Sequence, residues 1–308
     1  MKQFSVPILP IRVERDTDSK MQTYEVSGIE LEYIPGCTAG RNLFTGAFFA
    51  GGTDGLAVSF CAEAPHAKAF AQRQYDSYTR EGLAAQRNAV PPGFTAKRRS
   101  YKGKVFEDDC LELFIRPADS DVYYGWEINA CGACLDYRAG VGESGLKAVS
   151  VPNRAQDGSA EQRDGTAAQD GSAEQRDGTA APDAHRKVCG RKTDRIEGID
   201  IHFDYDWQSR AQWRMECEDG FWYLELFVPW SDFGMSEPPV RGTVWYGTIN
   251  RIDAGVYGRP HVRGESGLQC LLDFADTDAP APRFHQPQRF AAFEWLPLPK
   301  KNTGGTSK

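Results

Sequence analysis

The sequence predicts an all-β protein, a jelly-roll β-sandwich with two long insertions, and three observations support this prediction. The 308 residues include 31 Gly and 18 Pro, which suits many strands joined by tight turns. Aromatic residues make up 12% of the chain, and they recur in short segments where apolar and polar residues alternate. These segments follow one another without the intervening helices of a parallel α/β protein, so a sandwich is favoured.

The expected strands share this alternation and are bounded by turn residues. In chain order they are 55–63, 105–117, 123–130, 135–138, 199–203, 213–217, 221–228, 244–252, 268–274 and 290–296. Alternation within 105–117 places Glu112 and Leu113 on opposite faces of the strand. Within 123–130 it places Glu127 and Asn129 on the face opposite Trp126. The short connection between these two strands predicts that they pair, so Glu112 and one of Glu127 or Asn129 should share a face.

The first predicted insertion, residues 67–104, is strongly basic. It holds nine Lys or Arg residues against two acidic residues, and a short helix is expected to end before Pro91 and Pro92. Such a segment could contact phosphate or an acidic polysaccharide, but a solvated insertion between two strands is the commoner case. We expect a solvated, partly helical insertion.

The second predicted insertion, residues 152–195, contains a perfect 13-residue repeat, in which 155–167 and 168–180 are identical. The repeat is polar and cannot bury enough apolar surface to offset the entropy of ordering, so a disordered loop is expected. Residues 298–308 predict a flexible tail. With these segments set aside, the simplest organisation is a single domain over residues 1–308.

Charge and segment composition exclude several classes of function. The chain has 36 Lys and Arg against 43 Asp and Glu, a net charge of −7, which argues against a nucleic-acid binder. No stretch is apolar over the length of a membrane span, and the start of the chain lacks the apolar core of a secretory signal. We therefore expect no membrane partner and a cytoplasmic location, with export by another route left open.

The Cys and His residues do not predict a metal or redox centre. Cys131 and Cys134 have CxxC spacing, but the chain has no second such pair to complete a zinc site. The five His residues show none of the spacings of a His-based metal site. The simpler interpretation is that these thiols are small apolar side chains in strands.

The densest polar cluster is 107–112, followed by Glu127 and Asn129. Carboxylates and amides on a sheet face bind sugar hydroxyl groups, while nearby aromatic rings cover the apolar faces of the sugar. On composition alone, edge charges and turn caps explain these residues equally well. A glycosidase would need two carboxyl groups at a defined separation, for which Glu112 with Glu225 or with Asp109 is conceivable.

Residues 105–114 and 124–132 resemble the carbohydrate-binding module family 9-like proteins, which are DOMON-like sandwiches. Further matches are Pro229 with Trp230, the segment 245–251 and the segment 284–290. The order and spacing of these motifs are more specific than any motif alone, and together they span residues 25–297 apart from the two insertions.

The resemblance implies a jelly roll that binds a sugar, in the best-known members a chain end, between two aromatic rings. The residues that match the clamp and its polar neighbours are Phe106, Asp109, Glu112, Glu127, Asn129, Phe284 and His285. Both clamp residues are Trp in the best-known modules and Phe here, which reduces the stacking area and removes the N–H donor. The resemblance also allows a structural calcium ion, without assigning its ligands, and implies no other cofactor.

The predicted function is therefore non-catalytic carbohydrate binding, of a mono- or oligosaccharide, in a carbohydrate catabolic context. Two alternatives stay open at this point. One is a glycoside-hydrolase-type enzyme acting on O-glycosyl compounds, and the other is an intracellular scaffold that keeps the sandwich but has lost its ligand.

Overall fold

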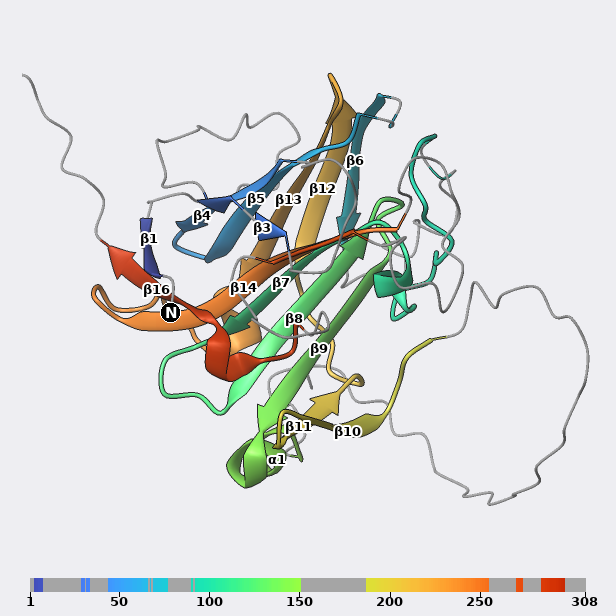
Figure 1. Cartoon of the computed structure of the whole chain (residues 1–308). Helices are drawn as coiled ribbons and strands as arrows, with labels where there is room; N and C mark the ends of the chain where they lie inside the picture. Colours follow the sequence, from blue (N-terminus) through green and yellow to red (C-terminus); the bar gives the residue numbers. More distant parts are fainter. Residues whose placement is uncertain are drawn as a thin grey trace, which may run out of the picture.

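The structure is a computed structural model, and it describes eleven stretches of the chain. They are residues 3–7, 29–30, 32–33, 44–65, 67, 69–76, 90, 92–150, 187–254, 270–273 and 284–296. Figure 1 colours these residues along the sequence and draws the others in grey. All structural statements below concern the described residues.

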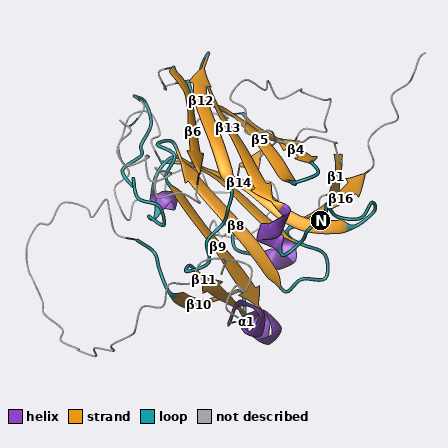
Figure 2. Cartoon of the chain, turned by 180° about the vertical axis from the view of Figure 1, so that it is seen from behind, coloured by secondary structure: helices purple, strands orange, loops and turns teal. Residues whose placement is uncertain are grey.

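Most of the described chain lies in two β-sheets (Figures 1 and 2). The larger sheet follows the order β1 (Gln3–Pro7), β16 (Ala291–Leu296), β14 (Val244–Asp253), β7 (Cys110–Arg116), β8 (Val122–Asn129), β9 (Cys134–Val141), β11 (Ile199–Asp204) and β10 (Arg191–Ile196). Strand β15 (Cys270–Asp273) also pairs with β14 and with β3 (Glu32–Tyr33). Strands β1 and β16 are parallel, whereas the other pairs in this sheet are antiparallel.

The smaller sheet is antiparallel throughout. Its order is β2 (Ile29–Glu30), β4 (Thr45–Gly51), β5 (Gly55–Glu63), β13 (Phe221–Pro229), β12 (Gln212–Glu218) and β6 (Phe70–Asp76). Alternate residues of β13 are buried, from Trp222 to Val228. One face of this sheet therefore contributes to the core and the other lies toward solvent.

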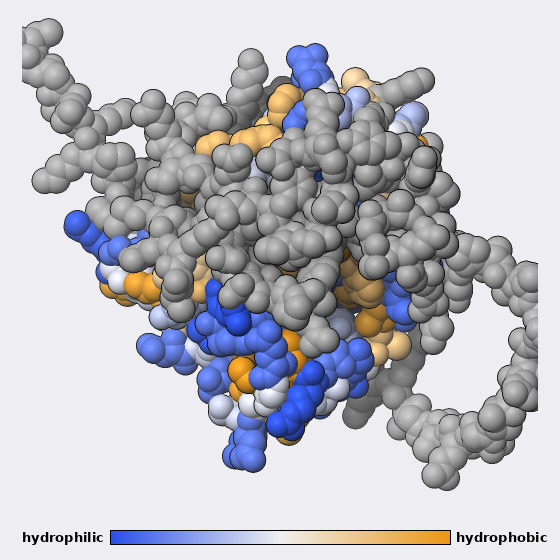
Figure 3. Space-filling model, in the orientation of Figure 1, coloured by the Kyte–Doolittle hydropathy of each residue, from blue (hydrophilic) through white to orange (hydrophobic). Residues whose placement is uncertain are grey.

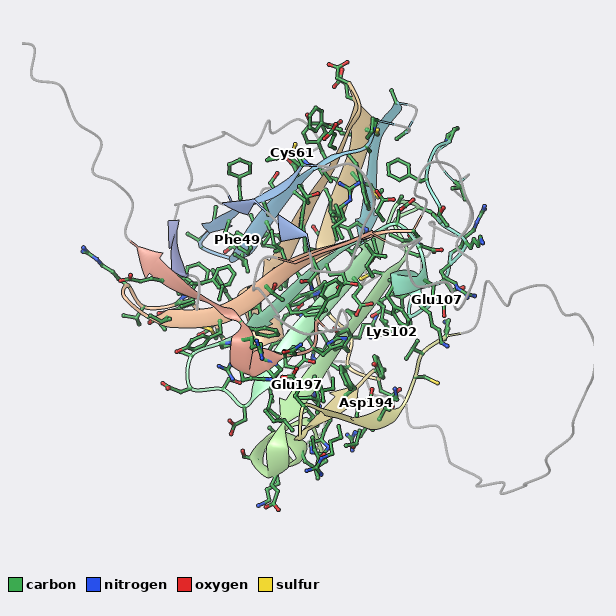
Figure 4. The ribbon with its side chains drawn as sticks, in the orientation of Figure 1. Phe49, Cys61, Lys102, Glu107, Asp194 and Glu197 are labelled. Carbon is green, nitrogen blue, oxygen red and sulfur yellow. The ribbon has the colours of Figure 1, made fainter. Side chains whose placement is uncertain are left out.

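The two sheets pack face to face over a shared aromatic and aliphatic core. Phe49 of β4, labelled in Figure 4, packs edge-on against Phe293 of β16 with 5.0 Å between the ring centroids. Arg251 of β14 crosses the interface and donates to Thr45 Oγ1 at 2.9 Å and to the carbonyl oxygen of Glu63 at 2.8 Å. The all-β sandwich predicted from the sequence is therefore confirmed.

Two local features differ from the predicted strands. The segment expected to begin a strand at 105 forms a short 3-10 helix, η2 (Val105–Glu107), so β7 begins only at Cys110. A helix that was not predicted, α1 (Gly142–Ser150), follows β9 directly and packs on β9 and β11. Further short 3-10 helices are η3 (Trp230–Phe233) and η5 (Pro287–Arg289). No helix in the described part of the chain has the length and apolar character needed to cross a membrane.

The structure revises the boundaries of both predicted insertions. Part of 67–104 is strand β6, which pairs with β12 and so belongs to the smaller sheet. Residues 77–89, where most of the expected helix falls, lie outside the described residues. The predicted disordered loop 152–195 also extends too far, because residues 191–195 form most of β10. The repeat itself and the tail 298–308 lie outside the described residues.

The described remainder of the basic segment is fixed to the sandwich by a buried ion pair. Lys102 (Figure 4) lies 2.6 Å from Asp136 Oδ1 of β9 and donates to the carbonyl oxygen of Trp207 at 2.6 Å. Asp136 Oδ2 accepts from Tyr101 Oη at 3.0 Å and from the Ser209 N–H at 2.7 Å. This part of the segment is therefore a structural element and not a freely solvated insertion.

The surface at the lower end of the molecule is hydrophilic. Figure 3 shows the polar side chains gathered where α1 and the β10–β11 hairpin lie. Lys192 and Asp194 of β10 form an exposed ion pair at 2.8 Å, and Arg195 lies 3.5 Å from Asp200 of β11. Exposed pairs of this kind contribute little to stability, so this end is a solvated surface.

Candidate functional site

The candidate site is built on a pair of carboxyl groups on the outer face of the larger sheet. In the register of β7 and β8, Glu112 lies directly opposite Glu127. Both side chains are buried, at 2% and 3% relative exposure. Like charges that lie directly opposite each other in a sheet repel, and burial adds a desolvation cost. The sequence predicted that Glu112 would share a face with one neighbour on β8, and the structure confirms Glu127 in that position.

Glu112 is held by the strand on its other side. Asn250 of β14 lies opposite Glu112 and donates from Nδ2 to Glu112 Oε2 at 3.2 Å. Thr248 Oγ1, on the same face of β14, donates to Asn250 Oδ1 at 3.2 Å and so orients the amide. Asn250 was not among the predicted site residues, although it belongs to the segment 245–251 that carries part of the family resemblance. Only the strand register could show that this segment adjoins Glu112.

Burial determines the charge state of Glu127. Burial raises the pKa of its carboxyl group to about 8, and the Tyr137 hydroxyl of β9 opposes this rise. The carboxyl group is therefore mostly protonated at neutral pH, because its charged form is poorly solvated. The Tyr137 hydroxyl is the hydrogen-bond partner of this carboxyl group, and within the described part of the chain neither Glu127 Oε2 nor Tyr137 Oη has another.

An aromatic cluster adjoins this pair and holds His285. The imidazole ring stacks on Phe114 of β7, with 4.9 Å between centroids and 13° between planes, and its Nδ1 lies 3.1 Å from Tyr123 Oη. Phe203 of β11 meets the imidazole edge-on at 5.1 Å. Burial lowers the pKa of His285 to about 4, so the ring is neutral at pH 7 and acts as part of the aromatic surface.

The two predicted clamp residues lie in different segments, Phe106 in η2 before β7 and Phe284 shortly before η5. Phe106 belongs to η2, which precedes β7, and its side chain is 38% exposed. Phe284 directly precedes His285, whose ring stacks on Phe114 toward the other end of β7, and Phe284 is buried at 9% exposure. Their roles in binding remain predictions.

Two of the predicted site residues bind the protein's own backbone. Asp109 Oδ2 accepts from the Thr95 N–H at 2.5 Å and Oδ1 accepts from the Ala254 N–H at 2.8 Å. Burial, followed by the nearby Asp253 carboxylate, raises the pKa of Asp109 to about 7. These contacts connect the start of β7 to the end of β14, so they favour a structural role for Asp109.

Asn129 holds the turn between β8 and β9. Its Oδ1 accepts from the Cys131 N–H at 3.2 Å and the Ala133 N–H at 3.0 Å. Its Nδ2 donates to the Arg98 carbonyl oxygen at 2.6 Å and to Asp108 Oδ2 at 2.9 Å. The CxxC spacing is thus part of a tight turn, in which Gly132 has φ of 85°. Cys131 and Cys134 are buried thiols that form no disulfide, and Cys131 Sγ donates to the Ala96 carbonyl oxygen at 3.5 Å.

The structure supports neither of the two carboxyl pairs considered for a glycosidase, Glu112 with Glu225 and Glu112 with Asp109. Glu225 lies on β13 of the other sheet and forms an ion pair with Arg214 of β12, so its pairing with Glu112 in a glycosidase site is wrong. Asp109 is bound to backbone N–H groups as described. Among the described residues, no group of three or more His, Cys, Asp or Glu side chains could hold a metal ion, and a calcium site is not assigned.

Solved structures with a similar chain path come from carbohydrate-binding proteins. A candidate carbohydrate-binding protein from Bacteroides uniformis is 14% identical with a TM-score of 0.43, covering 88% of this chain and 86% of that one. A carbohydrate-binding module family 9 from Caldicellulosiruptor kristjanssonii, solved with glucose, is 8% identical with a TM-score of 0.45, covering 98% of this chain and all of that one. The same module solved with cellotriose gives 9% identity, a TM-score of 0.45 and full coverage of both chains.

Sequence comparison gives a more specific result. No curated protein was found to match the chain. The family model for carbohydrate-binding family 9 matches residues 84–159, about a quarter of the chain, which includes β7, β8, β9 and α1. The resemblance to carbohydrate-binding family 9 is thereby confirmed, over the stretch that carries Phe106, Glu112 and Glu127.

Proposed function

We propose that the chain is a non-catalytic carbohydrate-binding protein, and that its sugar ligand binds at the outer face of β7, β8 and β14. The observation that carries this proposal is the polar group of Glu112, Glu127 and Asn250 on one face of β7, β8 and β14, with the partly exposed Phe106 in η2 just before β7. The match of 84–159 to carbohydrate-binding family 9 supports the same conclusion. Modules of this family bind sugars and are not themselves catalysts.

The chemistry of these residues suits a sugar ligand. A carboxylate accepts hydrogen bonds from hydroxyl groups, and an amide both donates and accepts. Aromatic rings cover the apolar C–H faces of a sugar ring. Phe106 is the ring that a ligand reaches most directly, because its side chain is the exposed one of the two.

The test is calorimetric titration of the full chain with glucose and with cellotriose, together with an assay for released product. We expect saturable binding and no product. Phe106→Ala removes an exposed ring and should weaken binding by about tenfold without changing the unfolding midpoint. Glu112→Gln removes a carboxyl acceptor and should weaken binding by about 10- to 100-fold.

Glu225→Gln is the matched control, because Glu225 is a strand carboxylate on the other sheet. It should leave the affinity unchanged. Product formation by the wild-type chain would contradict the non-catalytic proposal, and unchanged affinity in both Phe106→Ala and Glu112→Gln would contradict the site.

A further inference from the structure

A basic surface borders η2, the short helix that carries Phe106. Residues 97–104 include five Lys or Arg residues and no acidic residue, although the whole chain has a net charge of −7. A concentration of positive charge on an otherwise acidic protein attracts anions. A site for a neutral sugar does not need such a surface, so its position beside Phe106 requires an explanation.

The first part of this surface is fixed to η2 by hydrogen bonds. The N–H groups of Lys97 and Arg98 donate to the two carboxylate oxygens of Asp108, the residue that ends η2, at 2.9 Å and 2.8 Å. The Arg98 guanidinium also pairs with Glu107 of η2, which is labelled in Figure 4. Arg98 thus compensates the negative charge of Glu107, while the exposed Lys97 presents its charge to solvent.

A segment that is distant in the sequence completes the surface. Lys187 pairs with Gly103 in an isolated antiparallel bridge, and the Val188 N–H donates to the Lys102 carbonyl oxygen at 2.6 Å. Lys104 follows Gly103 and directly precedes η2. Lys187 is exposed, and the Lys104 side chain is 39% exposed. The two segments therefore add two further lysines where η2 begins.

We propose that Lys97, Lys104 and Lys187, here called the basic rim, bind the carboxylate of an acidic sugar whose ring stacks on Phe106. The Phe106 side chain is 38% exposed, so it can cover the apolar face of a sugar while ammonium groups beside it bind a charged substituent. The ligand class is a uronic acid or an oligosaccharide that contains one. This inference rests on the proposed function and specifies the sugar further.

The buried carboxyl groups of the site set the orientation of such a ligand. Glu112 and Glu127 lie opposite each other on β7 and β8. A sugar carboxylate beside them would add a third acidic group next to two buried ones, which is unfavourable. Beside the basic rim the same carboxylate gains charge-assisted hydrogen bonds. The sugar hydroxyl groups should therefore face Glu112 and Glu127, and the carboxylate should face the basic rim.

The experiment compares cellotriose with its C6-oxidised counterpart, a trisaccharide in which each hydroxymethyl group is replaced by a carboxylate. In calorimetric titration of the full chain at about 20 mM salt, the acidic trisaccharide should bind at least about tenfold more tightly, because exposed charge pairs contribute about 1.5- to 5-fold each. This ratio of affinities should fall below about threefold at about 1 M salt, where the screening length is about 3 Å. Equal affinity for the two sugars at low salt would overturn the inference.

A triple variant in which Gln replaces every lysine of the basic rim should lower the ratio of the two affinities below about threefold. The matched control, Lys147→Gln with Arg195→Gln and Arg241→Gln, removes the same charge from exposed positions elsewhere and should keep the ratio. An equal fall in both triple variants would overturn the basic rim, because net charge alone would then explain the preference.

Two further outcomes separate this inference from the proposed function. Inorganic triphosphate that binds as tightly as the acidic trisaccharide would overturn the inference, because the surface would then recognise anions without a sugar ring. Binding of cellotriose with no preference for the acidic trisaccharide would overturn this inference alone, whereas no binding of either sugar would overturn the proposed function.

Discussion

Replacing Lys102 with Met tests whether the basic segment is fastened to the sandwich by its buried ion pair. The ammonium group lies 2.6 Å from Asp136 Oδ1 and donates to the carbonyl oxygens of Asp136 and Trp207. Its side chain is 10% exposed and that of Asp136 is 0% exposed. Removing one partner of a buried pair typically costs about 3–5 kcal/mol.

The contacts around Asp136 place the expected loss within that range. Asp136 keeps two donors after the substitution, the Tyr101 hydroxyl and the Ser209 N–H, so its charge is still partly compensated. The Trp207 carbonyl oxygen loses the Lys102 donor, which adds about 1–3 kcal/mol. We therefore expect Lys102→Met to lower the free energy of unfolding by about 3–4 kcal/mol, measured by urea denaturation of the full chain.

Lys104→Met is the matched control from the same segment. Lys104 lies 4.0 Å from Glu107, and both side chains are more than 30% exposed, so its loss should change the free energy of unfolding by less than about 0.5 kcal/mol. Equal effects of the two substitutions, or a loss below about 1 kcal/mol for Lys102→Met, would refute the conclusion that the ion pair anchors this segment.

Three further predictions concern the candidate site and its support. Gly125→Ala should destabilise the fold by about 3 kcal/mol, because the added Cβ overlaps the Tyr137 ring; a loss below about 1 kcal/mol in urea denaturation would contradict that close approach. Asn129→Ala should cost about 3 kcal/mol in the same assay, because it leaves the Cys131 and Ala133 N–H groups without their acceptor. The folded-state pKa values of Asp109 and Glu127 are raised to about 7 and about 8, above their unfolded values. The stability they contribute is fully present below the unfolded pKa values of about 4 and is lost as pH rises toward the folded values, so the melting temperature should fall between about pH 4 and 8 and level off above that range; Glu127→Gln should reduce this fall, and an unchanged slope in that variant would count against the raised pKa.

The alternation of apolar and polar residues along the chain was sufficient to predict most of the strands of the sandwich. The segment 55–63 is strand β5 with the predicted bounds, and 221–228 is β13 with one more residue. These strands have one buried and one partly exposed face, which is the condition under which alternation appears in a sequence. Helix α1 was missed because it is only nine residues long and begins at Gly142, where φ is 66°, so it has neither the length nor a usual capping residue.

The site was predictable only in part, because its residues come together through strand register. The short β7–β8 connection allowed Glu112 and Glu127 to be placed on one face. The positions of Asn250 and Tyr137 depend on which strands flank that pair, and a single sequence does not encode this order locally. The polar character of Asn129 suggested a ligand, but its amide is occupied by the turn.

The most direct test of sugar binding at this face is a nuclear magnetic resonance titration of the ¹⁵N-labelled full chain with cellotriose. If the account is correct, the amide signals that shift will cluster at Glu112, Glu127 and Asn250, which lie side by side on β7, β8 and β14. Shifts confined to the solvent-facing side of the smaller sheet, around Tyr223 and Glu225 of β13, or no shifts at saturating cellotriose, would contradict it.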